Sequence, residues 1–168
     1  MNAAHQHLLF LFAQKKAAQL LEESGLSAKG WTFGWDNRST SFGMCRYSIK
    51  KITLSRVLTK HQKSDDVVDT LIHEVAHALN PGDGHGPAWK ATCYKMGITP
   101  SRVGTLNEGA KDELYKKARW VMVDPNNKIV KYYMNRPTIA IRKLPTTYLS
   151  GRKEETIGKL RIIPNPND

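Results

Sequence analysis

Apolar residues recur at the three-and-four spacing of an amphipathic helix near the start of the chain. Between residues 4 and 23 this spacing includes Leu8, Leu11 and Leu21, and Ser-Gly at residues 24–25 then interrupts it. One long helix is therefore predicted here.

The period of the apolar residues changes to two after this helix. Trp31, Phe33 and Trp35 alternate with small or polar residues, and further runs typical of strands follow at 42–47 and 49–54. Turn-forming residues separate the runs. Three short strands in an antiparallel meander are expected.

Helical spacing returns at residues 64–79. Two aspartates in its first turn interact favourably with the helix dipole, and Asn-Pro-Gly follows its last turn. Another helix is predicted from Pro87 to Met96, because proline suits the first turn and Gly97 comes next. Residues 105–119 are compatible with one more helix.

The remainder of the chain predicts a hairpin and a tail. Residues 120–123 and 128–134 flank Asp-Pro-Asn-Asn, a turn sequence. After Pro137 the prolines and the sparse apolar pattern predict a loosely held segment. We divide the chain into a domain over residues 1–104 and a basic C-terminal extension over 105–168.

Charge is unevenly spread along the 168 residues. The whole chain has 26 Lys and Arg against 15 Asp and Glu, a net charge of +11. Residues 1–99 contain 12 basic and 8 acidic side chains, and residues 100–168 contain 14 and 7. This surplus favours polyanionic partners, nucleic acid first.

Neither a membrane span nor a secretory signal is expected. The closest apolar run, Leu8–Ala13, is far shorter than the roughly 20 residues that a span requires, and it lacks the flanks of a signal peptide. Cys45 and Cys93 form no Cys-x-x-Cys pair and are expected as reduced thiols. A cytoplasmic protein follows, and the surplus of positive charge adds association with nucleic acid as an expectation.

The motif His-Glu-x-x-His occupies residues 73–77, within the predicted helix 64–79. Residues four apart share one helical face, so the imidazoles of His73 and His77 reach one cation while Glu74 lies beside it. This combination is typical of zinc peptidases.

A catalytic zinc ion needs a third protein ligand and one open position. We select His85, which follows a glycine-rich turn able to fold back over the end of the helix. Asp83 is the nearer acidic alternative, although a carboxylate there is commonly a turn or cap residue. Glu108 is a second alternative, but it lies 31 residues after His77 and a glycine follows it.

These residues resemble the SprT-like, or Spartan-type, zinc metallopeptidases. That family pairs the helical motif with a His-Gly-x-x-aromatic segment, present at residues 85–89, and with an upstream Phe-Gly-x-Cys-x-Tyr strand, present at 42–47. The resemblance covers about residues 6–100. It implies an α+β zincin-like fold containing an N-terminal helix, the meander, the active-site helix, a ligand loop and a further helix.

The resemblance also implies one zinc ion held by His73, His77 and His85, with Glu74 as the general base. Characterised members act on DNA-bound or DNA-crosslinked proteins, so a protein substrate and DNA are the implied partners. For the oxyanion, Tyr94, Tyr47 and Arg46 are candidates by position. An edge strand of the sheet is expected to hold the substrate backbone.

The C-terminal extension departs from the family pattern. Many relatives have a cysteine zinc ribbon here, whereas Asp-Pro-Asn-Asn stands where a Cys-x-x-Cys knuckle would be. The resulting cysteine-free hairpin is a candidate nucleic-acid surface through charge and stacking. Its candidate contacts are Trp120, Lys128, Lys131, Tyr132 and Arg136. The alternative is that its aromatic residues pack onto the protein core.

Two other functions stay open. One is a nucleic-acid-binding protein without catalytic activity, in which zinc is structural. The other is a processing peptidase that cleaves a specific partner without DNA.

Overall fold

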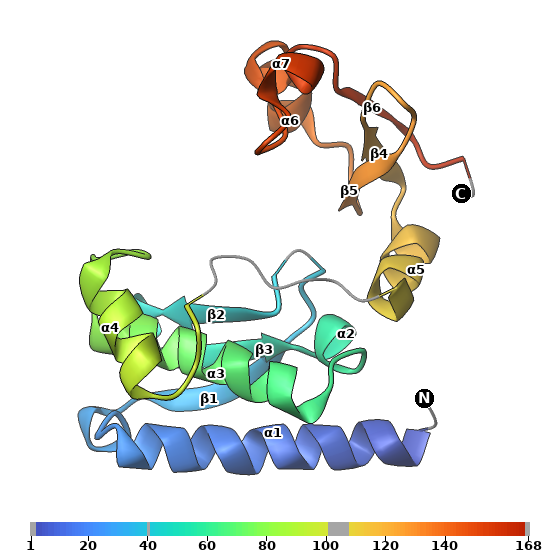
Figure 1. Ribbon diagram of the computed structural model, residues 1–168. Coiled ribbons are helices and arrows are strands. Elements are labelled where there is room, and N and C mark those ends of the chain that lie inside the picture. The colour runs from blue at the N-terminus through green and yellow to red at the C-terminus, as the bar shows by residue number, and fades with distance from the viewer. Residues whose placement is uncertain (1–2, 40, 101–107, 167–168) are drawn as a thin grey trace. The chain divides into compact units, whose positions relative to one another are not determined.

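The computed structural model describes residues 3–39, 41–100 and 108–166. It divides the chain into two compact units, Met1–Asn107 and Glu108–Asp168, each with its own three-stranded sheet (Figure 1). The boundary predicted between residues 104 and 105 falls outside the described residues.

The first unit contains the predicted helices and strands. In chain order they are α1 (Ala3–Glu23), η1 (Ser27–Lys29), β1 (Thr32–Asp36), β2 (Gly43–Arg46), η2 (Tyr47–Ile49), β3 (Lys51–Ser55), α2 (Arg56–Thr59), α3 (Ser64–Leu79) and α4 (Pro87–Lys95). The positions of the long elements agree with the periods of the apolar residues.

The prediction of an antiparallel meander is wrong, because the strands of the sheet have a different order and one pair is parallel. Strand β3 lies between the other two, parallel to β1 and antiparallel to β2. The physical reason is burial: residues 52–55 of β3 are buried on both faces, and a strand covered on both faces belongs at the centre of a sheet. Strands β1 and β2 are therefore the edges.

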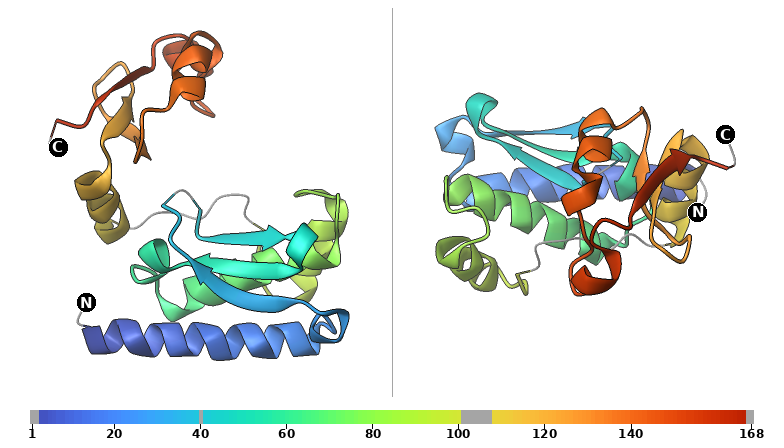
Figure 2. Two further views of the ribbon diagram at one scale, coloured as in Figure 1. Left: turned by 180° about the vertical axis from the view of Figure 1, so that it is seen from behind. Right: turned by 90° about the horizontal axis from the view of Figure 1, so that it is seen from above.

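Helices α1 and α3 pack side by side against one face of this sheet (Figure 2). The sheet contributes Ile52 and Leu54 of β3 to the core, together with their register partners Phe33, Trp35 and Cys45. The apolar stripe of α3 faces the same core, so its other faces remain for polar side chains.

A polar network covers the opposite face of β3. The hydroxyl of Thr53 donates to Asp36 at 2.7 Å, and Arg38 donates to Thr53 at 3.0 Å and forms an ion pair with Asp36. Ser55 donates to the carbonyl of Arg38. These bonds partner the buried polar side chains and tie the segment after β1 to the central strand.

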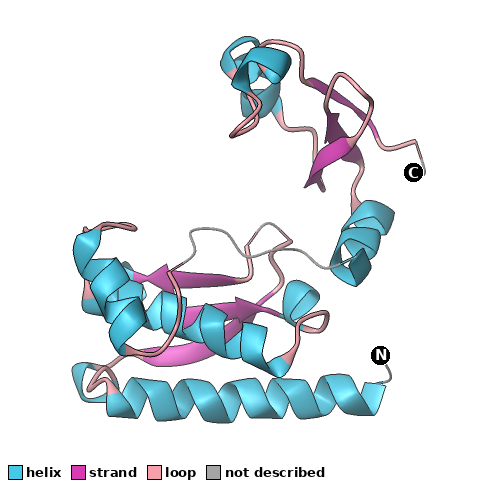
Figure 3. Cartoon of the chain, in the orientation of Figure 1, coloured by secondary structure: helices cyan, strands magenta, loops and turns pink. Residues whose placement is uncertain are grey.

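The second unit is built on a sheet of order β5-β4-β6 (Figure 3). Its elements are α5 (Glu108–Lys117), β4 (Trp120–Val123), β5 (Ile129–Tyr133), α6 (Thr138–Lys143), η3 (Leu144–Thr146), α7 (Lys153–Thr156) and β6 (Arg161–Pro164). The predicted hairpin is β4 and β5, which pair antiparallel.

The prediction of a loosely held tail after Pro137 is wrong. Strand β6 pairs antiparallel with β4 and so completes the sheet. Leu160 is buried beside it, and Asn165 donates to the carbonyls of Tyr115 and Ala118. Few apolar residues are enough to order this segment, because its strand adds to a hairpin that is already formed.

In the described part of the chain, no helix combines the length and apolar character that crossing a membrane requires. The two cysteines are free thiols, with Cys93 buried and Cys45 half-buried.

Candidate metal and catalytic site

Helix α3 presents His73 and His77 on one face, one turn apart, with Glu74 beside them. The side chains of Val67, Leu71 and Val75 anchor the helix in the core. Because the anchored stripe sets the rotation of the helix, the two imidazoles point away from the core.

The loop after α3 brings His85 back to this face. Gly82 and Gly84 have φ values of 87° and 60°, the left-handed region in which glycine carries no steric penalty. Two such residues allow the chain to reverse within a few positions. As a result, His85 faces the helix residues across the turn.

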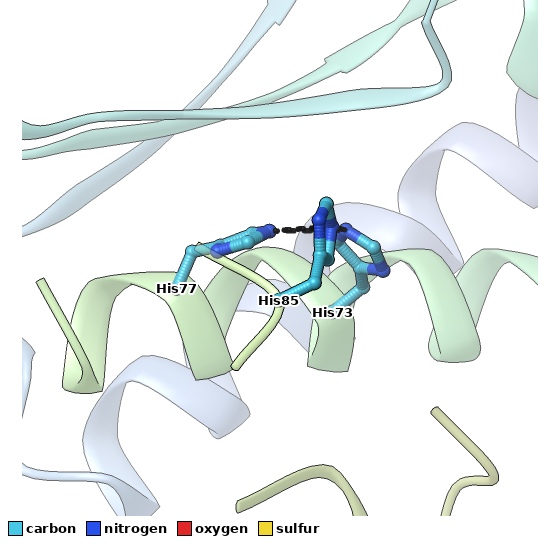
Figure 4. Close-up of side chains that lie close together, drawn as sticks. All are labelled: His73, His77 and His85. Atoms are coloured by element: carbon cyan, nitrogen blue, oxygen red, sulfur yellow. Dashed lines mark hydrogen bonds between the residues drawn. The ribbon is translucent and has the colours of Figure 1, made fainter. Parts of the chain in front are cut away.

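The three imidazoles converge on one point (Figure 4). The Nε2 atom of His77 lies 3.1 Å from that of His73 and 3.2 Å from that of His85, and the third separation is 3.2 Å. Zinc–nitrogen bonds of about 2.0–2.1 Å in a tetrahedron put ligand nitrogens about 3.3–3.4 Å apart. The three residues therefore fit a zinc ion with little adjustment.

The described residues would supply three protein ligands to such an ion. Among the described residues, the group of metal-ligating side chains consists of these three histidines alone. A site with three protein ligands and an open position is typical of catalytic zinc, whereas structural zinc usually has four.

His77 is oriented by the ligand loop itself. Its ring bonds the backbone carbonyl of Gly84, and since Nε2 faces the other histidines, this bond uses Nδ1. Burial, and then the neighbouring His85, lower the pKa of His77, while the bond to Gly84 raises it. A neutral imidazole with a fixed tautomer is the form that binds a metal.

Trp89 of α4 supports all three histidines. Its indole is fully buried and stacks on His77 at a centroid distance of 5.4 Å. It also meets the edges of His73 and His85 at 4.8 and 4.6 Å, and its Nε1 donates to the carbonyl of His73 at 3.3 Å. The sequence signal for this residue is the aromatic position of His-Gly-x-x-aromatic.

Of the two alternative third ligands, Asp83 has another role. The carboxylate of Asp83 accepts the backbone N–H of Trp89 at 2.8 Å, which satisfies an N–H in the first turn of α4. Asp83 is therefore a capping residue. Glu108 begins α5 of the second unit, and its side chain is outside the described part of the chain.

Glu74 is almost fully buried, with 7% of its surface exposed. Burial raises the pKa of its carboxyl to about 7, although a hydrogen bond from the backbone N–H of Cys45 and the charge of Arg38 lower it. A carboxyl group whose pKa lies near neutrality suits proton transfer at physiological pH.

The three oxyanion candidates differ in their contacts. The hydroxyl of Tyr47 donates to the carbonyl of His77 at 3.0 Å, and burial together with Cys45 raises its pKa to about 12. Arg46 ends β2 with an exposed side chain, and Tyr94 of α4 is also exposed. Among the described residues, Tyr47 is the one of these three candidates that bonds to helix α3.

The nucleic-acid candidates lie in the second unit. Trp120 lies under the guanidinium of Arg136, 5.6 Å from the ring centroid, and Trp120 pairs across the sheet with Tyr133. Lys131 lies 5.5 Å from the ring centroid of Tyr133, on the same face. Three of the five candidates, Trp120, Lys131 and Arg136, are thus brought together.

The other two candidates are placed differently. Tyr132 points to the opposite face of the hairpin, where its ring meets Tyr115 at 6.4 Å. Lys128 lies in the turn, and its backbone N–H donates to Asp124. Alternation along a strand separates neighbouring residues, so Tyr132 and Tyr133 cannot share a face.

Comparisons with known proteins agree with the motifs of the first unit. A model of the SprT-like family matches residues 6–107, which include every residue of the histidine site. A protein of Caenorhabditis elegans named DNA-dependent metalloprotease dvc-1 is 31% identical over 94 residues. The match covers 46% of this chain and 26% of that protein, so most of the relative's length has no counterpart in it.

Proposed function

Because this chain belongs to the SprT-like family, we propose that it is a zinc endopeptidase that cleaves proteins bound or crosslinked to DNA. The observation that carries the proposal is the triangle of Nε2 atoms from His73, His77 and His85, with the buried carboxylate of Glu74 on the same helix.

In this proposal three histidines hold the metal and Glu74 moves the proton. A bound zinc ion would supply Lewis acidity toward the scissile carbonyl and lower the pKa of the attacking water. The carboxylate of Glu74 accepts a proton from that water and later returns it to the nitrogen of the leaving amine. Trp89 contacts all three imidazoles and so fixes their orientation.

Strand β2 is suited to hold the substrate backbone. It is an edge strand next to α3, paired with β3 on one side and with no other described strand on its second side. A substrate added to this edge is bound through main-chain groups, which makes cleavage tolerant of sequence. Tyr47, directly after this strand, is our choice for the residue nearest the developing oxyanion.

DNA would then restrict where such a tolerant enzyme acts. The residues 100–168 contain 14 basic and 7 acidic side chains, and the relative named above is described as DNA-dependent. We assign nucleic-acid contacts to Trp120, Lys131 and Arg136, with Lys128 in the adjoining turn. The protein would accordingly be found with DNA in the cytoplasm.

The test compares wild type with Glu74→Gln and His85→Ala. Zinc content is measured by metal analysis, and cleavage of a DNA-binding protein is measured with and without DNA at low salt. We expect wild type to hold one zinc ion and to cleave in the presence of DNA, Glu74→Gln to hold zinc without cleaving, and His85→Ala to lose both.

Other results would favour the other two functions. Wild type that binds DNA and zinc but never cleaves protein points to a structural metal. Cleavage that is indifferent to DNA points to a processing peptidase.

A further inference from the structure

Two residues of strand β2, Gly43 and Cys45, lie next to Glu74. The carbonyl of Phe42 accepts the N–H of Ser55 at 2.8 Å, so the backbone groups of residue 42 point toward β3. Because the direction of the backbone N–H and carbonyl groups alternates along a strand, those of residues 44 and 46 point toward β3 as well. The N–H and carbonyl groups of Gly43 and Cys45 therefore point away from β3, along the edge beside α3.

The first of these positions has no room for a side chain. A Cβ atom built on Gly43 would lie 2.7 Å from Cγ, 2.8 Å from Oε1 and 3.1 Å from Cδ of Glu74. Gly43 is not among the glycines with a positive φ, so backbone conformation does not require glycine here. What requires it is the side chain of Glu74, which occupies the space over the strand.

The second position supplies a hydrogen bond. The backbone N–H of Cys45 donates to the carboxylate of Glu74. Glu74 is thus held at two points, by its stem against Gly43 and by its carboxylate on Cys45. A glutamate has several rotatable bonds, and contacts at both the stem and the head select one rotamer.

We infer that Gly43 and the backbone N–H of Cys45 are positioning groups for the general base. The inference rests on the proposed function for the role of Glu74, and the contacts themselves stand apart from it. Gly43 leaves the space that the stem of Glu74 fills, and Cys45 sets the direction of its carboxylate. The histidines meet one another and Trp89, so metal content and base positioning are measured separately.

The kinetic test compares Gly43→Ala with Gly34→Ala. Gly34 lies on β1 of the same sheet, where a Cβ would meet the end of the flexible Lys51 side chain, which can move aside. Zinc content, the visible spectrum of the cobalt-substituted protein, kcat and KM are measured for each with an unfolded protein substrate and DNA.

Gly43→Ala is expected to keep one metal ion per chain and the wild-type cobalt spectrum. Its kcat should fall by roughly 100-fold or more with KM nearly unchanged, because general-base catalysis contributes at least that factor. Gly34→Ala should match wild type. Full activity in Gly43→Ala, or loss of its metal, would overturn the inference.

A stability cycle tests the contact without any need for activity. Glu74→Ala removes all three atoms that the new Cβ would meet. Gly43→Ala should therefore lower the melting temperature of the protein with Glu74 and leave that of the Glu74→Ala protein almost unchanged. Equal destabilisation in both backgrounds would show that residue 43 affects the strand in general and would reject the inference.

The bond from Cys45 has its own spectroscopic test. Glu74→Gln replaces a charged acceptor by a neutral one, so the amide proton of Cys45 should move upfield. The amide protons of Met44 and Arg46, which face β3, serve as internal controls. A Cys45 resonance that moves no more than theirs would contradict the bond.

Failure of the proposed function gives a different pattern. Wild type without any proteolysis that depends on Glu74 would reject the proposed function and the kinetic consequence drawn from it. The stability cycle and the Cys45 resonance would still decide whether Gly43 and Cys45 hold this side chain.

Discussion

The indole of Trp89 stacks on the imidazole of His77, with an angle of 25° between the rings. This relationship joins α4 to the histidine cluster, because the same indole also touches His73 and His85. A buried aromatic residue therefore has two effects here, on the stability of the core and on the orientation of the ligands.

We predict that Trp89→Ala lowers the free energy of unfolding by about 3–5 kcal/mol, the usual cost of removing a buried indole. It should also weaken zinc binding by about 10–100-fold, as loss of a residue that orients ligands does. Urea unfolding and competition with a chelator measure the two effects. Trp89→Phe is the control that keeps a ring. Zinc affinity unchanged in Trp89→Ala would show that the histidines orient themselves.

Asp83 is expected to affect α4 and not the metal. Its carboxylate accepts the N–H of Trp89, so Asp83→Ala should cost about 1 kcal/mol of stability, as the loss of a helix cap does. Zinc stoichiometry should stay at one ion per chain, and Asp83→Asn, which keeps an acceptor, should lie near wild type. If metal analysis finds Asp83→Ala without zinc, Asp83 is a ligand after all.

The network around Asp36 predicts a stability that depends on acid. Although burial raises it, hydrogen bonds from Arg38 and Thr53 bring the pKa of Asp36 down from 3.8 to about 2. A carboxyl group with a lowered folded-state pKa stabilises the protein above its unfolded pKa, and this contribution is lost as pH falls from 3.8 toward 2.

Urea unfolding of zinc-free protein between pH 2 and 5 should therefore show a loss of up to about 2 kcal/mol that is absent in Asp36→Asn. Removing zinc beforehand excludes the acid release of the metal as the cause. Parallel pH curves for wild type and Asp36→Asn would mean that another carboxyl group is responsible.

Removal of metal should leave the second unit intact. Asp124 is buried in the turn between β4 and β5, where it accepts the N–H groups of Asn126 and Lys128 and pairs with Arg152 at 3.0 Å. These bonds hold the turn together through protein groups. Hydrogen exchange with and without a chelator should change near His85 and stay the same over β4 and β5. Loss of protection in those strands would reveal a metal there.

Lys131 and Arg136 should each contribute one phosphate contact. Lys131→Ala and Arg136→Ala are expected to weaken DNA binding for every sequence and to reduce the slope of log affinity against log salt by about 1 each. Fluorescence anisotropy at several salt concentrations measures this. Lys16→Ala, an equal change of charge on α1, is the control and should leave the slope unchanged. A slope that stays at the wild-type value in all three would place the DNA surface elsewhere.

Local patterns in the sequence were sufficient for the elements and for the histidines. The three-and-four spacing predicts α1 and α3, and a helix with histidines four apart necessarily puts both on one face. His85 could be predicted because a glycine-rich turn directly after the helix lets the chain fold back over the end of that helix. Each of these relations joins residues at most 12 positions apart.

The relations that needed the tertiary structure join residues far apart in the chain. Strand β3 lies between β1 and β2, and β6 joins β4, because burial over a whole sheet decides which strand is central. Glu74 lies against Gly43 and Cys45 through packing between segments about 30 residues apart, which no short window contains. The sequence by itself thus predicted the three histidines that the structure brings together, since spacing on one helix and one turn is local. Only the tertiary structure decided what holds them in place, since packing depends on segments that meet only after folding.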